Sequence, residues 1–164
     1  MKRRNSLART LVQLSVLVVL VVAGLNYQFI WDQYALATFK PTTDVAQIEG
    51  QLALTQTGRA LFYRGQPQID SKTQFNADCQ TSRGMLELGC YYLSRIYVLH
   101  IEDARLAPEM QVVAAHELLH AAWLRLSRGE QATLTTELEQ VYAGIQDQDL
   151  RDHMASYAKS EPGE

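Results

Sequence analysis

The stretch that decides the fold is VVAAHELLHAAWL, residues 112–124. Pro108 before it and Ser127-Arg128-Gly129 after it are typical of helix ends, so we predict a helix from Pro108 to about Leu126. The only ionisable residues of the stretch are His116, Glu117 and His120. Because every other side of the helix is apolar, we expect it to be buried on all faces.

The His-Glu-x-x-His spacing predicts a metal site. Residues four apart lie one helical turn from each other, so the imidazoles of His116 and His120 face one point and can share a Zn²⁺ ion. Glu117 is rotated by about 100° from His116, which suits a general base for an activated water. Without partners, three buried polar groups would cost several kcal/mol, and zinc would offset that cost. The alternative is a pair of hydrogen-bonded core histidines with Glu117 reaching solvent.

A hydrolytic zinc site usually has a third protein ligand. One class of enzymes continues the motif as His-x-x-Gly-x-x-His, and this class is excluded because Trp123 and Leu126 occupy the Gly and His positions. Another class takes a Glu from a later helix. Glu161 and Glu164 are far enough along the chain to return to the helix, although they lie in a Pro-Gly turn. The third ligand therefore stays open at this point. The acids that follow the motif helix at a distance are Glu137, Glu139, Asp147, Asp149, Asp152, Glu161 and Glu164.

The rest of the chain predicts an α+β fold, in which a small sheet or hairpin packs on the buried helix. The runs 89–92 and 95–101 are dense in aromatic and β-branched residues and predict β structure. Helical spacing or capping residues predict further helices, and residues 65–82 are expected to be rich in loops. The expected helices are 45–52, 55–63, 133–145 and 150–158.

The N-terminal segment predicts a membrane anchor. Residues 11–31 contain no charged residue, and 21 helical residues span about 30 Å, the thickness of a bilayer core. The basic residues in positions 1–10 predict a cytoplasmic tail, which places residues 44–164 outside as an extracytoplasmic domain after a linker over 32–43. A cleavable signal peptide ending near Val21-Val22-Ala23 is the alternative, and it would make the protein secreted.

Cysteine usage and charge agree with export. Cys79 and Cys90 are the only cysteines, and an oxidising compartment would let them form a disulfide. Two unpaired core thiols are the alternative. Beyond position 10 the chain keeps 11 of its 15 basic residues against all 18 acidic ones, a net charge of −7. We therefore expect no nucleic-acid partner.

Residues 89–91, 96–98, 103–106 and 114–122 together resemble a group of bacterial membrane-anchored zinc metallopeptidases. The resemblance covers roughly residues 48–164 and implies a zincin-like fold, a peptide or protein substrate, and a third ligand that is a Glu. In that group a Gly-Glu pair similar to Gly163-Glu164 precedes a helix that carries this Glu. The resemblance thus implies either a ligand beyond the chain end, with a C-terminally truncated domain, or a protein that lacks its third protein ligand. A pseudopeptidase or surface binding protein that keeps the fold is the alternative function.

Overall fold

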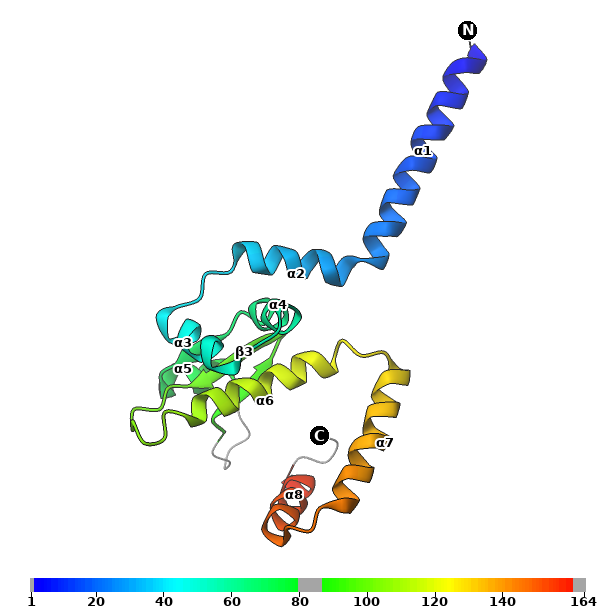
Figure 1. Ribbon diagram of the computed structural model, residues 1–164. Helices are drawn as coiled ribbons and strands as arrows, with labels where there is room; N and C mark the ends of the chain where they lie inside the picture. Colours follow the sequence, from blue (N-terminus) through cyan, green and yellow to red (C-terminus); the bar gives the residue numbers. More distant parts are fainter. Residues whose placement is uncertain (1, 80–86, 161–164) are drawn as a thin grey trace. The chain divides into compact units, whose positions relative to one another are not determined.

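The structure is a computed structural model that describes residues 2–79 and 87–160, without the side chains of residues 2–8, 153 and 157–160. Its helices and its small sheet confirm the α+β class (Figure 1). The chain divides into an N-terminal unit, Met1–Ala122, and a C-terminal unit, Trp123–Glu164. The N-terminal unit contains α1 (Lys2–Leu25), α2 (Tyr27–Thr38), α3 (Thr43–Leu52), α4 (Gln56–Arg64), β1 (Gln68–Asp70), α5 (Lys72–Asp78), β2 (Gly89–Tyr92), β3 (Arg95–Leu99) and nearly all of α6 (Glu109–Trp123).

The sheet has the strand order β1-β3-β2, so β3 is central and β2 is an edge strand. β2 and β3 form the predicted hairpin, antiparallel, with Tyr92 opposite Arg95. Leu93 and Ser94 both have positive φ, which is the backbone conformation of the type I′ turn that joins tightly paired strands. β1 pairs with β3 in parallel, and it lies in the segment that we expected to be loop.

The two faces of β3 are covered by different helices. Ile96 and Val98 belong to the main core with residues of α3, α4 and α6, while Tyr97 packs on the other side with Phe75 of α5 and Cys79 at its C-cap. This alternation follows from the period of two in a strand. The main core consists of Val45, Ile48, Phe62, Ile96, Val98, Ala114 and Leu118.

The predicted anchor over 11–31 is not one helix. α1 ends at Leu25 and α2 begins at Tyr27, with a bend of 71° between them. Among the described residues no single helix is both long and apolar enough to cross a membrane, although the segments 9–25 and 27–38 meet that test as a bent pair. The side-chain amide of Asn26 donates to the Val22 carbonyl (2.8 Å) and so satisfies a C-terminal carbonyl of α1.

The predicted linker over 32–43 is also different in the structure. Residues 32–38 are the second half of α2, which packs against α4, and only residues 39–42 connect α2 to α3. The reason is a charged contact: Asp32 turns toward Arg64 of α4, with 3.6 Å between Oδ1 and Nη1. A segment that hydropathy alone assigned to anchor and linker is therefore part of the folded unit.

The C-terminal unit contains α7 (Arg128–Gly144) and α8 (Gln148–Ser160). α7 begins with a capping box, in which the Ser127 side chain accepts from the Glu130 N–H and the Glu130 carboxylate accepts from the Ser127 N–H. The Ser127 hydroxyl also donates to the Glu130 carboxylate at 2.7 Å, and this hydrogen bond, with a smaller contribution from the Ser127 N–H, holds the pKa of Glu130 below its usual value. No residue of α7 is buried.

Candidate metal centre

The helix predicted from Pro108 forms as α6, and it carries all three residues of the motif. Our prediction that it is buried on every face is wrong. Ala114, Glu117, Leu118 and Ala121 face the core, whereas Leu119 on the opposite side is 67% exposed. The physical reason is that α6 packs on one face of a three-stranded sheet, which covers a single stripe of the helix.

His116 and His120 converge as the spacing predicts. Their Nε2 atoms are 3.2 Å apart, and their rings meet edge to face with centroids separated by 4.9 Å. Each ring thus turns the same nitrogen toward one point. The His116 side chain is exposed and that of His120 is half-buried, so this point is accessible from solvent.

Glu117 lies on the buried side of α6, with 5% of its surface exposed. The alternative with hydrogen-bonded core histidines placed Glu117 in solvent at the edge of the helix. The buried position of Glu117 differs from that expectation. The edge strand β2 crosses over it: a Cβ placed on Gly89 would lie 2.7 Å from Oε1 of Glu117 and 2.3 Å from Cγ1 of Val113. Both distances are shorter than real Cβ contacts, so any larger residue here would require Val113 or Glu117 to shift.

The histidine pair fits a tetrahedral zinc ion. With Zn–N bonds of 2.0–2.1 Å and a tetrahedral angle, two ligand nitrogens are expected about 3.3 Å apart. The observed separation of 3.2 Å between the two Nε2 atoms agrees with this value, and it also equals the length of a direct N–H···N hydrogen bond. Imidazole nitrogens are donors of the kind that zinc prefers.

The third ligand is not among the residues that the structure describes. Over residues 2–79 and 87–160, no group of three or more His, Cys, Asp or Glu side chains could hold a metal ion. Glu161 and Glu164, the two candidates within the chain, lie outside the described residues. Within the described residues, the candidate centre therefore consists of His116 and His120, with Glu117 on the same helix.

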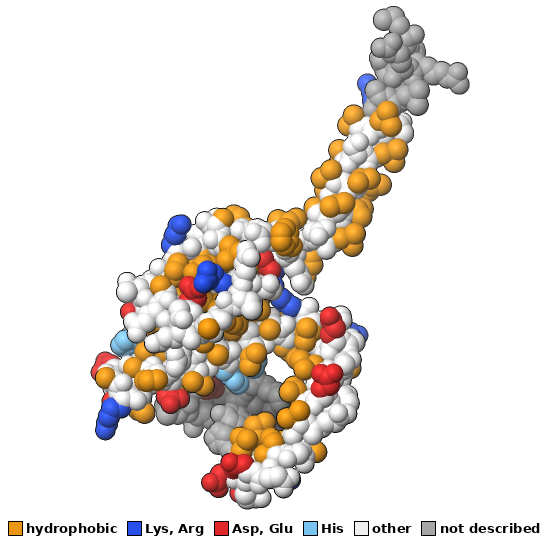
Figure 2. Space-filling view, viewed as in Figure 1, with side chains coloured by type: hydrophobic (Ala, Val, Ile, Leu, Met, Phe, Trp, Pro, Cys, Tyr) orange, Lys and Arg blue, Asp and Glu red, His pale blue; other side chains and the backbone are white. Residues whose placement is uncertain are grey.

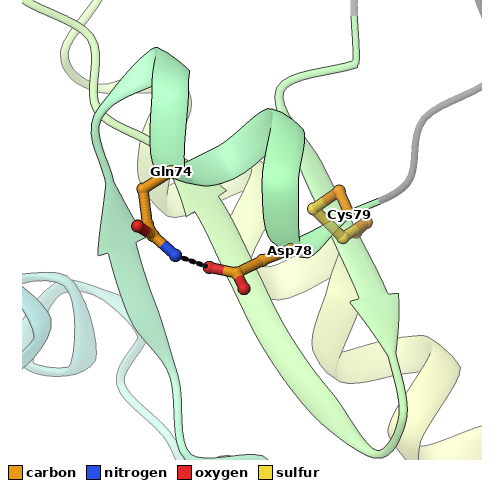
Figure 3. Close-up of a disulfide and its surroundings, with 4 residues drawn as sticks. Gln74, Asp78 and Cys79 are labelled. Atoms are coloured by element: carbon orange, nitrogen blue, oxygen red, sulfur yellow. Dashed lines mark hydrogen bonds between the residues drawn. A yellow bond between two sulfur atoms is a disulfide. The ribbon is translucent and has the colours of Figure 1, made fainter.

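A disulfide lies next to the strand that covers Glu117. Cys79 and Cys90 are bonded, with their Cα atoms 5.9 Å apart, which confirms the predicted pair. Figure 3 shows the disulfide at the end of α5, beside a hydrogen bond of 2.6 Å from the Gln74 amide to the Asp78 carboxylate. Because Cys90 follows Gly89 directly, the disulfide fixes the start of β2 to α5.

Sequence reasoning missed two buried acids and the role of Gly89. Asp70 at the end of β1 is buried and its Oδ2 has no hydrogen-bond partner. Burial, with a smaller contribution from the charge of Asp78, raises the pKa of Asp70 above its usual value. Asp32 is the second buried acid that sequence reasoning missed. No local pattern marks these residues, since each acquires its environment only through tertiary packing.

Comparison of the chain with protein-family models, with curated proteins and with solved structures gave no match.

Proposed function

We propose that the protein is a membrane-anchored, extracytoplasmic, zinc-dependent peptidase with a zincin-like arrangement of a small sheet over an active-site helix. The main support is the convergence of the His116 and His120 Nε2 atoms at 3.2 Å, with the Glu117 carboxylate on the same helix and under the edge strand. Peptide bonds are the proposed substrate because this motif is typical of peptidases.

His116 and His120 would hold the metal, and Glu117 would act as the general base. Bound Zn²⁺ would supply Lewis acidity, which lowers the pKa of a water to about 7 and polarises a carbonyl. The Glu117 carboxylate accepts a proton from the attacking water and returns it to the leaving amine nitrogen. Glu117 is buried against the backbone of Gly89 in β2, and this packing limits the motion of its carboxylate.

Anchoring and export belong to the same proposal. The basic residues of positions 1–10 would stay in the cytoplasm, α1 would cross the bilayer, and the units that follow would lie outside. A disulfide in the folded N-terminal unit supports an oxidising compartment.

A second candidate function is a non-catalytic binding protein that keeps the fold and uses the metal for stability. One observation favours it: the described residues supply two histidines and no third ligand to the centre. The two candidates differ in one property, because only the peptidase needs Glu117 as a base.

The test compares hydrolysis of a peptide library by the full chain, loaded with zinc, with that of Glu117→Gln. Glu109→Gln is the matched control, since Glu109 lies in the first turn of the same helix and is exposed. We expect Glu117→Gln to lose at least about 100-fold in rate, as expected for a general base, and to keep its zinc, while Glu109→Gln retains full activity. Equal activity of the wild-type chain and Glu117→Gln on every cleaved peptide would refute the mechanism, and zinc binding without any hydrolysis would favour the second candidate.

A further inference from the structure

α2 has its polar and apolar faces reversed relative to an ordinary surface helix. Tyr27, Ile30, Trp31 and Tyr34 recur at helical spacing and form an exposed stripe, in which Trp31 is 54% exposed. The only charged residue of the helix, Asp32, is buried on the opposite side. A helix that faces water normally exposes its charges and buries its aromatic rings.

The buried side of α2 is fixed to the domain. Asp32 is 8% exposed and pairs with Arg64 of α4, and α2 packs against α4. Phe39 at the end of α2 stacks on Tyr63 of α4 with ring centroids 4.9 Å apart. The orientation of the exposed stripe relative to the N-terminal unit is therefore set by the fold and not by a flexible linker.

The exposed stripe continues directly from α1. Apart from Asp32, no charged residue occurs between Leu11 and Thr38, so residues 11–25 of α1 and the exposed stripe of α2 both lack charge. Figure 2 shows hydrophobic side chains along α1 on the face in view. The stripe is rich in Tyr and Trp, which prefer the boundary between lipid headgroups and acyl chains.

The geometry of the two helices argues against α2 as part of the span itself. The 71° bend turns α2 away from the α1 axis, and inserting α2 deeper would drag the Asp32–Arg64 pair and α4 into hydrocarbon. Residues 9–25 of α1 cover about 26 Å at 1.5 Å per residue, slightly less than a bilayer core. A short span of this kind is stabilised by anchors at the interface.

We propose that the stripe Tyr27, Ile30, Trp31 and Tyr34 lies in the headgroup region of the bilayer that α1 spans, and that it holds the N-terminal unit against the membrane surface. The partner that contacts this stripe is the lipid of the membrane interface. The inference rests on the membrane anchorage in the proposed function and is independent of the proposed catalysis.

The test measures the depth of Trp31 in the full chain reconstituted in phosphatidylcholine and phosphatidylglycerol vesicles. Trp31 and Trp123 are the only tryptophans, so W123F leaves Trp31 as the single reporter. Two further chains carry W31F and W123F together with V18W in α1 or L106W in the exposed turn before α6. Each chain is quenched by lipids brominated near the headgroup or near the acyl end, and by aqueous iodide.

We expect Trp31 to be quenched roughly two-fold more strongly by shallow than by deep bromines, since an interfacial helix lies about 5–10 Å into the headgroup boundary. The V18W reporter should be quenched by deep bromines, and the L106W reporter by iodide alone.

Iodide quenching of Trp31 equal to that of the L106W reporter would overturn the inference and leave the anchorage intact. Protection of Trp31 from both iodide and bromines, which a protein partner or a second copy would cause, also overturns it. Deep quenching of Trp31 would place α2 within the span and would also overturn the inference. If no bromine quenches the V18W reporter, the anchorage fails and this inference fails with it, whatever the peptidase assay gives.

Discussion

The backbone of Gly89 lies against the carboxylate of Glu117, so close that a Cβ at position 89 would be 2.7 Å from Oε1. This relationship joins the edge strand β2 to the one acid of the motif. It explains why the strand begins with a residue that has low β propensity. The position of Glu117 thus depends on a residue 28 positions earlier in the chain.

Gly89→Ala is expected to destabilise the protein by about 1–3 kcal/mol, because the methyl group would overlap Val113 and Glu117. Gly50→Ala is the control, since a Cβ at this helical position in α3 meets nothing within 4 Å. We expect Gly50→Ala to be neutral or to stabilise by about 0.5–1 kcal/mol. Denaturant unfolding of both variants measures the difference, and equal stability of the two would contradict the close approach.

Removal of the disulfide by the pair C79S and C90S is expected to lower the free energy of unfolding by about 2–3 kcal/mol, because the bond closes a short loop. Reducing agent should shift the wild-type unfolding midpoint toward that of the variant and leave the variant unchanged. Since no other cysteine exists, a shift in the variant would mean that the reductant acts elsewhere.

Asp70→Asn is expected to stabilise the protein at neutral pH. Burial raises the pKa of Asp70, so the fold prefers the protonated carboxyl. This preference contributes fully to the free energy of unfolding below the ordinary pKa of 3.8. The contribution is lost as pH rises through the raised pKa of Asp70, and it is absent at higher pH. The neutral amide avoids this loss, and Oδ2 no longer holds a buried charge without a hydrogen-bond partner, an effect of about 1–3 kcal/mol.

The measurement for Asp70 is the unfolding free energy of wild type and Asp70→Asn from acid to neutral pH. The difference should grow with pH. A difference that is the same at every pH would assign the effect to packing and not to ionisation.

Asp32→Ala is expected to loosen α2 from α4. The substitution leaves Arg64 without its carboxylate, and its Nη1 is already buried without a hydrogen-bond partner, so we expect a loss of about 1–3 kcal/mol. Hydrogen exchange of residues 27–38 should speed up, while β3 stays protected. Gln33→Ala, an exposed neighbour, serves as the control, and unchanged exchange in Asp32→Ala would show that the pair does not hold the helix.

The motif helix and the hairpin were predictable because their signals are local. An apolar stretch with polar residues only at positions 116, 117 and 120 predicts α6, and a dense run of β-branched and aromatic residues predicts β3. β1 and α5 were not predicted. β1 has three residues and α5 has seven, and segments this short do not show a clear strand or helix period of apolar residues. Each is held by pairing or packing with β3, which local patterns do not contain.

In the candidate site, too, some features follow from the local sequence and others only from tertiary packing. The convergence of His116 and His120 follows from helical spacing, whereas the exposure of one side of α6 depends on how many strands cover it. The break at Asn26 was hidden because apolar and aromatic residues continue past it. Tertiary contacts, such as the pair between Asp32 and Arg64, assign the following residues to the domain.

Zinc stoichiometry tests the central claim most directly. Metal analysis after dialysis against limiting zinc should give about one ion per wild-type chain, and neither His116→Ala nor His120→Ala should retain it. His100→Ala is the matched control, because His100 is an exposed histidine at the end of β3 in the same unit, and it should bind zinc as the wild type does. A wild-type chain that never retains zinc, or a His116→Ala and His120→Ala double variant that retains it fully, would contradict the account.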